Sequence, residues 1–429
     1  MKNLLALAFL LQLFFYISCK PKNNSTEVIS ASYKDTFVDS LNLPQPFATE
    51  SATKKSKVIG WHNDKKPIAP VGFQVSKFVD NLDHPRWIYV ADNGDVFIAE
   101  ANSPHSVSDK LLGKNQSPNS IIMLRDSDKD GTYESKTEYL KGLNKPFGMV
   151  IINDHFYVAN TDAVIRFPYQ KDSMSITDKG TKIISLPGNE RHWTRNIVTN
   201  KNKDKFYVSV GSSTNVAEKG IEQESRRACI LEFNIDGTGE KLYASGLRNP
   251  VGMDWAPGTN TLWTTVNERD ELGDELVPDY LTSVKENGFY GWPYSYFGQH
   301  IDPRLKDNQR PDLVKKAIVP DMALGAHTAS LGLAFYTGNT FPAKYKNGAF
   351  IGQHGSWNRS SFVGYKVVFV PFNNGKPSGK AEDFLTGFIA NEAKSEVYGR
   401  PVGVAVLKDG SLLVADDDGN MIWRVTATK

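Results

Sequence analysis

Two observations predict an all-β fold, and more specifically a six-bladed β-propeller. The first is a recurring unit, in which an apolar strand, a polar turn and a second apolar strand usually follow a Pro or Gly. Residues 246–275 are the clearest copy, because Pro257-Gly258-Thr259-Asn260 separates two short apolar runs. The six copies begin at His84, Lys145, His192, Arg248, His327 and Arg400. One such unit cannot bury both faces of its sheet, so neighbouring copies are expected to stack around a ring.

The second observation concerns the two ends of the repeat region. Residues 71–79 alternate in polarity ahead of the first copy, and residues 421–426 form another strand pattern after the last one. Pairing of these two strands would complete the last blade, close the ring and remove free sheet edges. Outer strands are expected between the copies, at residues 121–125, 163–167, 229–234 and 367–371.

The composition is that of a globular protein and argues against several classes of function. Of the 429 residues, 50 are Lys or Arg and 48 are Asp or Glu, so the formal net charge is only +2. Such a chain has no overall field to attract nucleic acid, and no nucleic-acid partner is expected. With Cys19 and Cys229 as its two cysteines, the chain has no disulfide framework and no paired-cysteine motif for zinc or covalent haem.

The N-terminus resembles an export signal. Lys2 precedes an apolar run over residues 4–17, which is shorter than the ~20 residues that span a bilayer. Ser18-Cys19 resembles a bacterial lipoprotein cleavage site, so residues 1–18 are predicted to be a lipoprotein-type signal peptide. An ordinary signal peptide with an incidental cysteine is the alternative. The predicted product is exported to the periplasm or cell surface and is attached to a membrane only through lipid on Cys19.

Residues 19–65 are rich in Ser, Thr, Asn and Lys and show little periodicity. They are predicted to form a flexible arm or stalk. Residues 66–429 are then the propeller domain.

In a propeller, the loop before the first strand of each copy and the loop after the second strand open on the same face. A cationic mouth there predicts an anionic ligand, because buried charges need partners and arginines bind carboxylates in a bidentate manner. An acidic segment at 267–275 predicts a hard cation bound by oxygen. The side chains expected at the mouth are Arg86, Lys145, His192, Arg195, Arg248, His327, His354, Trp357, Arg359, Arg400 and residues 416–418. Each arginine could instead pair with a neighbouring blade, and His192 could be structural.

Two other segments allow more than one interpretation. Residues 125–133 carry Asp126, Asp128 and Asp130 ahead of a glycine, as calcium loops do. Thr137 stands where an EF-hand has its bidentate Glu, so a polar hairpin turn is favoured. Residues 285–295 are aromatic and Gly-rich, and they could form a pocket wall or simply pack an insertion.

Several phrases together resemble the sorbosone dehydrogenase family over about residues 70–428. They are GNERHWTRN (188–196), GLRNPVGMDWAP (246–257), NERDELGDE (267–275), ENGFYGWP (286–293), GQHGSWNR (352–359) and YGRPVGVAVLKDGSLLVADDDGNMIWRV (398–425). This family is related to soluble quinoprotein glucose dehydrogenases and to pyranose dehydrogenases. The resemblance implies that the cofactors are pyrroloquinoline quinone (PQQ) and Ca2+, and that a sugar or sugar aldehyde is oxidised by hydride transfer to the quinone.

The resemblance also implies roles for individual residues. His192 matches the general base, and Arg248 matches the arginine that stabilises the developing quinone oxyanion. Backbone carbonyls near Arg269 and Asp270 match calcium ligands, with Asp274 in support. Cofactor contacts are assigned to Arg86, Arg195, His327, His354, Arg359 and Arg400.

Some positions depart from the glucose dehydrogenases. Arg191 stands where those enzymes have an Asp before the base, Ser212 lies near the position of another Asp, and His354 or Arg359 replaces a cofactor-binding Lys. Substrate contacts therefore do not transfer. The function expected is an exported dehydrogenase that passes electrons to a separate acceptor. A calcium-dependent lactonase-like hydrolase and a non-catalytic carbohydrate-binding propeller are the alternatives.

Overall fold

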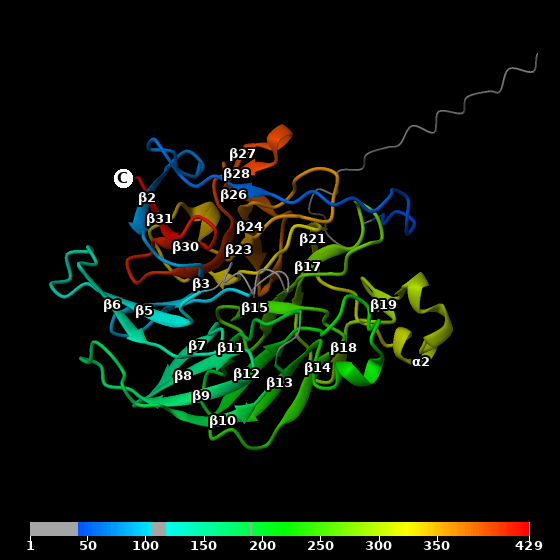
Figure 1. Ribbon diagram of the computed structural model, residues 1–429, viewed down its shortest axis with the longest axis horizontal. Helices are drawn as coiled ribbons and strands as arrows, with labels where there is room; N and C mark the ends of the chain where they lie inside the picture. Colours follow the sequence, from blue (N-terminus) through cyan, green and yellow to red (C-terminus); the bar gives the residue numbers. More distant parts are fainter. Residues whose placement is uncertain (1–41, 104–116, 189–190, 429) are drawn as a thin grey trace, which may run out of the picture. The chain divides into compact units, whose positions relative to one another are not determined.

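Antiparallel β-sheets account for nearly all the regular structure of the protein. The computed structural model describes residues 42–103, 117–188 and 191–428, all within one compact unit that runs from Tyr33 to Lys429. The predicted signal peptide and Cys19 lie outside the described residues. The ribbon in Figure 1 is built mostly of short strands, and the helices of the described residues have six residues or fewer.

Each of the six predicted copies forms an antiparallel hairpin, as the repeat predicts. The hairpins are β3 (Pro85–Val90) with β4 (Val96–Glu100), β7 (Met149–Ile152) with β8 (His155–Asn160), β11 (Ile197–Thr199) with β12 (Lys205–Val210), β15 (Pro250–Trp255) with β16 (Leu262–Val266), β22 (Ala334–Phe335) with β23 (Gly348–Gln353), and β29 (Pro401–Val406) with β30 (Leu412–Asp416).

Two outer strands extend each hairpin into a larger sheet. They are β5 (Ser120–Arg125) and β6 (Ser135–Leu140), β9 (Ala163–Pro168) and β10 (Thr181–Ser185), β13 (Cys229–Asn234) and β14 (Lys241–Ser245), β17 (Pro278–Ser283) and β21 (Met322–Ala326), β24 (Lys366–Asn373) and β26 (Glu382–Leu385), and β31 (Met421–Ala427) and β2 (Phe73–Val79). The strand β2 pairs antiparallel with β31, so the predicted pairing of the two ends of the repeat region is confirmed.

Smaller elements decorate these sheets. The short strands are β1 (Lys57–Val58), β18 (Gly288–Phe289), β19 (Ser295–Tyr296), β20 (His300–Ile301), β25 (Lys376–Pro377), β27 (Ile389–Asn391) and β28 (Glu396–Val397). The helical turns are η2 (Ile221–Glu224), η3 (Pro303–Asn308), α2 (Pro311–Val314), η4 (Ala343–Tyr345) and η5 (Glu392–Lys394). None of the helices in the described part of the chain has the length and apolar character that crossing a membrane requires.

The core lies between consecutive sheets, because their second and third strands are apolar on both faces. The strand β4, for example, is buried at all five positions. Five apolar clusters each lie mainly between two sheets that follow one another in the chain. A sixth joins the first and last sheets, since Ile98 and Leu124 pack with Leu413 and Ile422. The leading strand β29 likewise contacts β3.

Residues 42–65 differ from the flexible arm that their composition predicts. The strand β1 pairs in parallel with β28, and in Figure 1 this blue segment runs past β28. The ring of Trp61 stacks on Tyr398 at 4.8 Å and also packs on Phe388 and Trp423. Its indole N–H donates to Oδ2 of Asp416 (2.6 Å). A single partly buried aromatic residue therefore anchors a segment whose neighbours are polar.

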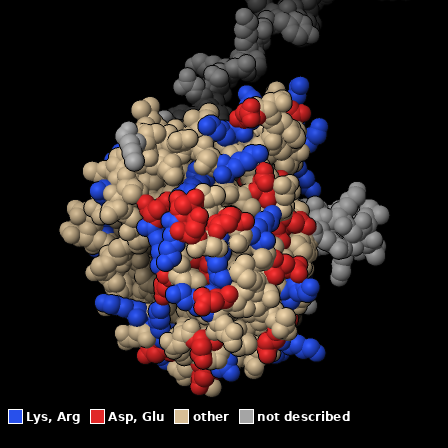
Figure 2. Space-filling model, turned by 90° about the vertical axis from the view of Figure 1, so that its left-hand side faces the viewer, with Lys and Arg blue, Asp and Glu red and all other residues tan. Residues whose placement is uncertain are grey.

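Charges of both signs are interspersed on the face shown in Figure 2, and neither sign covers it. This distribution agrees with the near-zero net charge of the sequence.

Candidate functional site

The predicted site residues lie at one end of the hairpins, where the leading strands begin and the second strands end. The register places Pro85 opposite Glu100, Pro250 opposite Val266 and Pro401 opposite Asp416. The loops that enter and leave each hairpin are therefore neighbours, as expected. Hydrogen bonds between these loops link most of the predicted residues.

His192 is held through one ring nitrogen. Its Nδ1 lies 2.9 Å from the carbonyl oxygen of Ser212 and 3.0 Å from Oγ of the same residue. A carbonyl oxygen can only accept, so Nδ1 carries the proton, and the lone pair of a neutral ring is then on Nε2. Nε2 forms no hydrogen bond with another described residue. Burial, followed by the charges of Arg248 and Arg191, lowers the pKa of His192 well below its ordinary value. His192 is therefore a neutral imidazole with a free acceptor nitrogen at neutral pH.

The close approach of the Ser212 loop to His192 depends on Gly211. A Cβ at this position would lie 2.6 Å from Cβ of His192 and 2.2 Å from Oδ1 of Asn249. Both distances are shorter than real contacts allow, so a larger residue would displace the histidine.

Arg248 is buried, and all of its N–H groups are engaged by the protein. Nε donates to the carbonyl of Asn215 (3.3 Å), and NH1 donates to the carbonyls of Asn267 (3.2 Å) and Glu268 (2.6 Å). NH2 donates to Oδ1 of Asn215 (2.8 Å) and Oδ2 of Asp270 (3.2 Å). A guanidinium has five N–H groups, and all five are used here. Arg248 can therefore act through its charge and by positioning loops, whereas the predicted role would require a free donor.

Asp270 lies among three cationic side chains. Its Oδ2 accepts from NH2 of Arg191 (3.0 Å) and of Arg248, and its Oδ1 is 3.6 Å from Nδ1 of His327. Burial acts to raise the pKa of Asp270, but His327, Arg248 and Arg191 lower it to about 2. Burial conversely acts to lower the pKa of His327, but Asp270 raises it above its ordinary value. With one carboxylate for two arginines, and with a histidine whose pKa is raised, this network has excess positive charge.

Arg195 supports the loop that carries His192. NH1 donates to the carbonyls of His192 and Thr194 (both 2.8 Å), and NH2 donates to that of Pro187 (2.5 Å). Burial lowers the pKa of Arg195 to about 9, so the guanidinium is still charged at neutral pH. The residue is fully buried and positions the loop, which differs from the cofactor contact assigned to it.

A second cationic group surrounds Asp417. Its carboxylate forms a close ion pair with NH1 of Arg86, and both of its oxygens lie 2.9 Å from Nε2 of His354. Arg400 donates to the carbonyls of His354 and Gly355 (both 2.9 Å). Burial and the charge of Arg400 lower the pKa of His354 to about 3, which leaves a neutral ring that donates from Nε2.

The ring of Trp193 links the two groups. The guanidinium of Arg86 lies 5.4 Å from the centroid of that ring, next to His192 in the chain. Nε of Arg86 is buried without a hydrogen-bond partner among the described residues, and so are Oδ1 of Asn160 and Oδ1 of Asn249. Asn160 ends β8, and Asn249 directly precedes β15. Such orphaned polar atoms at the strand ends are suited to a polar ligand.

The acidic segment uses most of its oxygens within the protein. The carbonyl of Asp270 accepts from Nδ2 of Asn215 (3.1 Å) and NH1 of Arg304 (2.8 Å). The side chain of Arg269 is fully buried between Glu268 and Asp302. Asn215 and Arg304 thus already donate to the carbonyl oxygen of Asp270, which was predicted to bind calcium.

The side chains of Asp274 and Arg359 each form hydrogen bonds with the loop that carries the other residue. Arg359 donates to the carbonyl of Asp274 (2.5 Å) and forms an ion pair with Glu275. The carboxylate of Asp274 accepts from the backbone N–H of Ser360 (3.0 Å) and from its hydroxyl. The structure thus brings Arg359 to the acidic segment, where it fastens two loops together.

Two clusters of three side chains in the described residues could hold a metal ion. His354, Asp417 and Asp418 offer ligand atoms that all lie within 4.8 Å of one another, and so do Asp126, Asp128 and Asp130. The first group lies within the site, although Arg86 already neutralises Asp417. In the second, Asp126 and Asp130 accept backbone N–H groups of their own loop, as the favoured turn interpretation expects.

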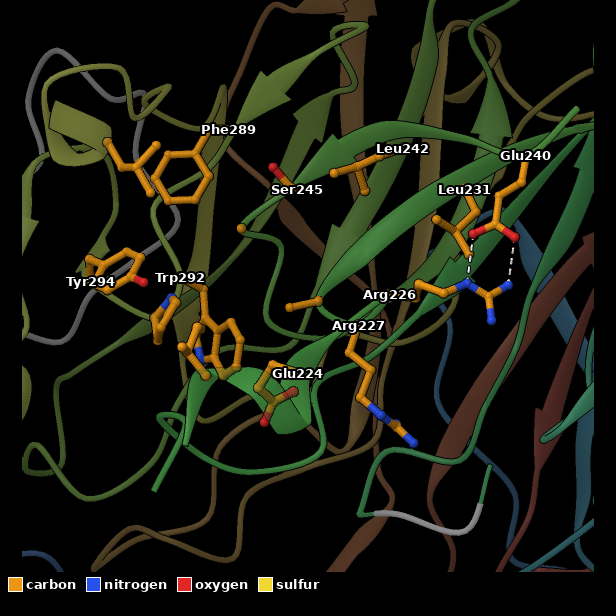
Figure 3. Close-up of a pocket in the computed structure, with 15 residues that line it drawn as sticks. Glu224, Arg226, Arg227, Leu231, Glu240, Leu242, Ser245, Phe289, Trp292 and Tyr294 are labelled. Carbon is orange, nitrogen blue, oxygen red and sulfur yellow. Dashed lines mark hydrogen bonds and ion pairs between the residues drawn. The ribbon is translucent and has the colours of Figure 1, made fainter. Parts of the chain in front are cut away.

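A pocket of about 370 Å3 lies beside the outer strands β13 and β14, apart from the predicted residues. Figure 3 shows Phe289, Trp292 and Tyr294 on one side of it and the ion pair of Arg226 with Glu240 on the other. The segment 285–295, which had two open interpretations, therefore forms a pocket wall. Trp292 also donates from Nε1 to the carbonyl of Asn215 (3.0 Å), which connects this wall to the Arg248 network.

Sequence reasoning did not find Asn215 or the role of Asp417. Asn215 ties Arg248 to Asp270, but it stands in a loop without any motif. Asp417 follows the last residue of β30 and belongs to a run that is typical of a turn. Arg191 was noted only as a departure from a pattern, yet it contacts Asp270 and is 41% exposed in its side chain, so it can reach a ligand.

The fold and the site together agree with comparisons to known proteins. A model of the TrAA12-like family matches residues 67–287 and 299–428, so the chain belongs to that family. The chain is homologous to a PQQ-dependent pyranose dehydrogenase and to soluble aldose sugar dehydrogenases.

Two relatives are similar to the chain over most of its length. It is 32% identical to an uncharacterised protein of Borreliella burgdorferi, over 83% of this chain and 89% of that one. It is 23% identical to the pyrroloquinoline quinone-dependent pyranose dehydrogenase of Coprinopsis cinerea, over 81% of this chain but only 52% of that enzyme.

Solved structures share the fold. The holo form of the PQQ domain of the Coprinopsis enzyme superposes with a TM-score of 0.69 at 20% identity, covering 86% of this chain and 98% of that domain. A calcium structure of the AA12 enzyme of Trichoderma reesei also has a TM-score of 0.69, at 19% identity, covering 86% of this chain and all of that one.

Proposed function

We propose that the protein is a quinoprotein dehydrogenase that oxidises a sugar or a sugar aldehyde. The observation that carries this proposal is the neutral imidazole of His192 beside a network with excess positive charge. Relatives that are named as PQQ-dependent sugar dehydrogenases support the class of reaction. Neither a sorbosone nor a pyranose preference follows from these observations.

We propose that the six large sheets, each of four or five strands, are the six blades of a propeller. Support comes from the six apolar clusters between consecutive sheets, including the one between the last sheet and the first. An experimental structure with any of these sheets outside a common ring would refute the count.

The site suits an anionic planar cofactor better than it suits a calcium ion on the acidic segment. Arg86 keeps an orphaned buried Nε, and Arg191 is partly exposed, so both could donate to carboxylates of PQQ. When bound, PQQ would supply the acceptor for a hydride. We propose Ca2+ as the second cofactor, as the calcium structure of a relative suggests. The Asp270 carbonyl could bind it only if Asn215 and Arg304 gave up their hydrogen bonds.

His192 would remove the proton of the sugar hydroxyl at Nε2. Its Nδ1 hydrogen bond to Ser212 fixes the ring, and burial together with the nearby arginines keeps it unprotonated before substrate binds. Arg248 would place Asn215 and Asp270 and contribute its charge. Electrons would leave to a separate acceptor.

Reconstitution tests this proposal directly. The purified chain is incubated with PQQ and CaCl2 and then assayed with glucose, other pyranoses and sugar aldehydes, using an artificial dye as acceptor. His192→Ala is expected to lower kcat by about 10²–10⁴-fold, because a general base is lost. His155→Ala, in a half-exposed histidine of β8, is the matched control and should retain activity. Dye reduction that survives His192→Ala would overturn the assignment of the base.

The same preparation distinguishes the proposed dehydrogenase function from a hydrolase function. His354, Asp417 and Asp418 are the residues that would carry metal-dependent hydrolysis. A rise in Tm with CaCl2 alone, without any rise when PQQ is added, would favour that alternative. A rise with PQQ would favour the dehydrogenase.

A further inference from the structure

The segment 42–60 builds a second pocket next to the candidate site. This pocket has a volume of about 600 Å3 and is lined by Phe47, Thr49, Glu50, Ser51, Thr53, Glu271, Trp357 and Asn358. Five of these residues come from the segment, which precedes the region matched by the family model. The other three belong to the two loops that carry Asp270 and His354. The pocket is thus a feature of this chain that its family membership does not supply.

Hydrogen bonds fix both walls of the pocket. The N–H of Phe47 donates to the carbonyl of Leu272 (2.9 Å), and the N–H of Asp274 donates to Oγ1 of Thr49 (2.8 Å). Gly273, at a φ of 104°, allows this approach, because a Cβ there would lie 2.9 Å from the carbonyl oxygen of Thr49. The segment is therefore seated on the acidic loop.

The opposite wall is tied to the same segment. The N–H of Lys54 donates to the carbonyl of Trp357 (2.8 Å), and Nδ2 of Asn358 donates to that of Ala52 (2.8 Å). Oδ1 of Asn358 accepts from the N–H of Glu271 (2.8 Å), which joins the two loops. The pocket is held by five hydrogen bonds and is preformed.

The chemistry of the lining points to a neutral polyol. Two aromatic rings face solvent, with Phe47 56% exposed and Trp357 37% exposed. Glu50 and Glu271 are exposed, and their carboxylates make no hydrogen bond or ion pair with other described residues. The lining has no Lys, Arg or His, in contrast to the cationic site next to it. Aromatic faces pack against the apolar C–H face of a sugar ring, while carboxylates and hydroxyls accept and donate hydrogen bonds to its hydroxyl groups.

We propose that this pocket is a subsite for a further sugar unit, so that the preferred substrate is a neutral oligosaccharide rather than a monosaccharide. The proposal rests on the proposed function, because the reacting unit would occupy the site of His192. Glu271 lines the pocket and directly follows Asp270, so the pocket and the candidate site share one loop.

Binding to the full chain without added cofactor tests the subsite independently of catalysis. Calorimetric titrations with cellotetraose, maltotetraose and glucose measure the advantage of a tetrasaccharide over the monosaccharide. At least one tetrasaccharide is expected to bind more tightly than glucose. Phe47→Ala and Trp357→Ala should each weaken its binding by about tenfold, because an exposed aromatic anchor is lost. The matched control is Ile301→Ala, an exposed apolar side chain outside the pocket, which should leave binding unchanged.

A variant that fills the pocket covers the case in which the truncations disturb folding. Ser51→Trp adds bulk at an exposed lining position and should also abolish the advantage of the tetrasaccharide. Tetrasaccharide binding that is equal in wild type and all three variants, or never tighter than that of glucose, would overturn the subsite. Tetrasaccharide binding that these variants lose, in a chain that reduces no dye, would support the subsite while refuting the dehydrogenase.

Discussion

At the residue scale, the same two arginines serve two purposes. Arg191 and Arg248 pair with Asp270, and their charges add to the effect of burial in keeping His192 unprotonated. A base beside cations is usually weakened, but here a neutral ring with a free Nε2 is what proton removal requires. The excess positive charge can be balanced by an anionic ligand, so that cofactor binding and readiness of the base depend on one network.

The pair of His327 and Asp270 predicts a pH dependence of stability. The pKa of His327 is raised in the folded protein, so its contribution is present in full below about pH 6.5, its ordinary value. That contribution is lost as the pH rises through the raised pKa. Asp270, with a pKa of about 2, stays charged throughout this range.

His327→Gln should therefore lower the free energy of unfolding more at pH 5.5 than at pH 9. Denaturant unfolding of wild type and variant at a series of pH values measures the difference. His155→Gln is the control and should change stability by less than about 0.5 kcal/mol, because its side chain is partly exposed. An equal loss at both pH values would contradict the ion pair.

At the element scale, loops and not strands decide the site. The loop after β12 supplies Ser212 to His192 and Asn215 to Arg248 and Asp270. The segment 42–65 then covers the loops after β16 and β23. Strands place these loops at one end of the hairpins, but contacts between loops orient the side chains.

Trp61 is the anchor of that segment. Its replacement by Ala should cost about 3 kcal/mol, because the aromatic packing and the hydrogen bond to buried Asp416 are lost together. The released segment should become sensitive to trypsin, which cleaves after Lys54, Lys55 and Lys57. Limited proteolysis with mass spectrometry measures this cleavage. His62→Ala, at the exposed neighbouring position, should leave the segment protected, and protection of the Trp61→Ala variant as well would show that other contacts suffice.

At the scale of the whole molecule, strands from the two ends of the repeat region complete the last sheet. The strand β2 pairs with β31, and the last sheet packs on the first. The segment before β2 pairs instead with β28, which belongs to none of these six sheets.

We propose that lipid on Cys19 anchors the protein to a membrane, and expression of the 429-residue chain in a bacterium tests this. If Cys19 is lipidated, the wild-type protein should partition into the detergent phase of Triton X-114. Cys19→Ser should move it to the aqueous phase. Cys229→Ser is the matched control and should stay in the detergent phase, because Cys229 is a buried thiol in β13. Detergent partition of the Cys19→Ser variant would refute the lipid anchor.

The sequence alone determined the six hairpins, the outer strands β5, β9, β13 and β24, and the pairing of β2 with β31. Alternating runs and apolar runs with turn residues between them are local signals, so strands of this kind can be predicted from the sequence alone. The sequence also determined which charged residues gather at one end, since that follows from the position of each residue relative to its hairpin.

Only the tertiary structure decided what those residues do. Arg195, Arg248 and Arg359 were expected to face a cofactor, yet most of their N–H groups are used by backbone carbonyls and carboxylates, and Nε of Arg195 is buried without a partner among the described residues. The order of residues in a chain does not specify which acceptors lie within 3 Å of a guanidinium, because those acceptors come from loops far apart in sequence. For the same reason the ordered segment 42–65 was not predicted: one tryptophan finds its aromatic partners more than 320 positions further along the chain.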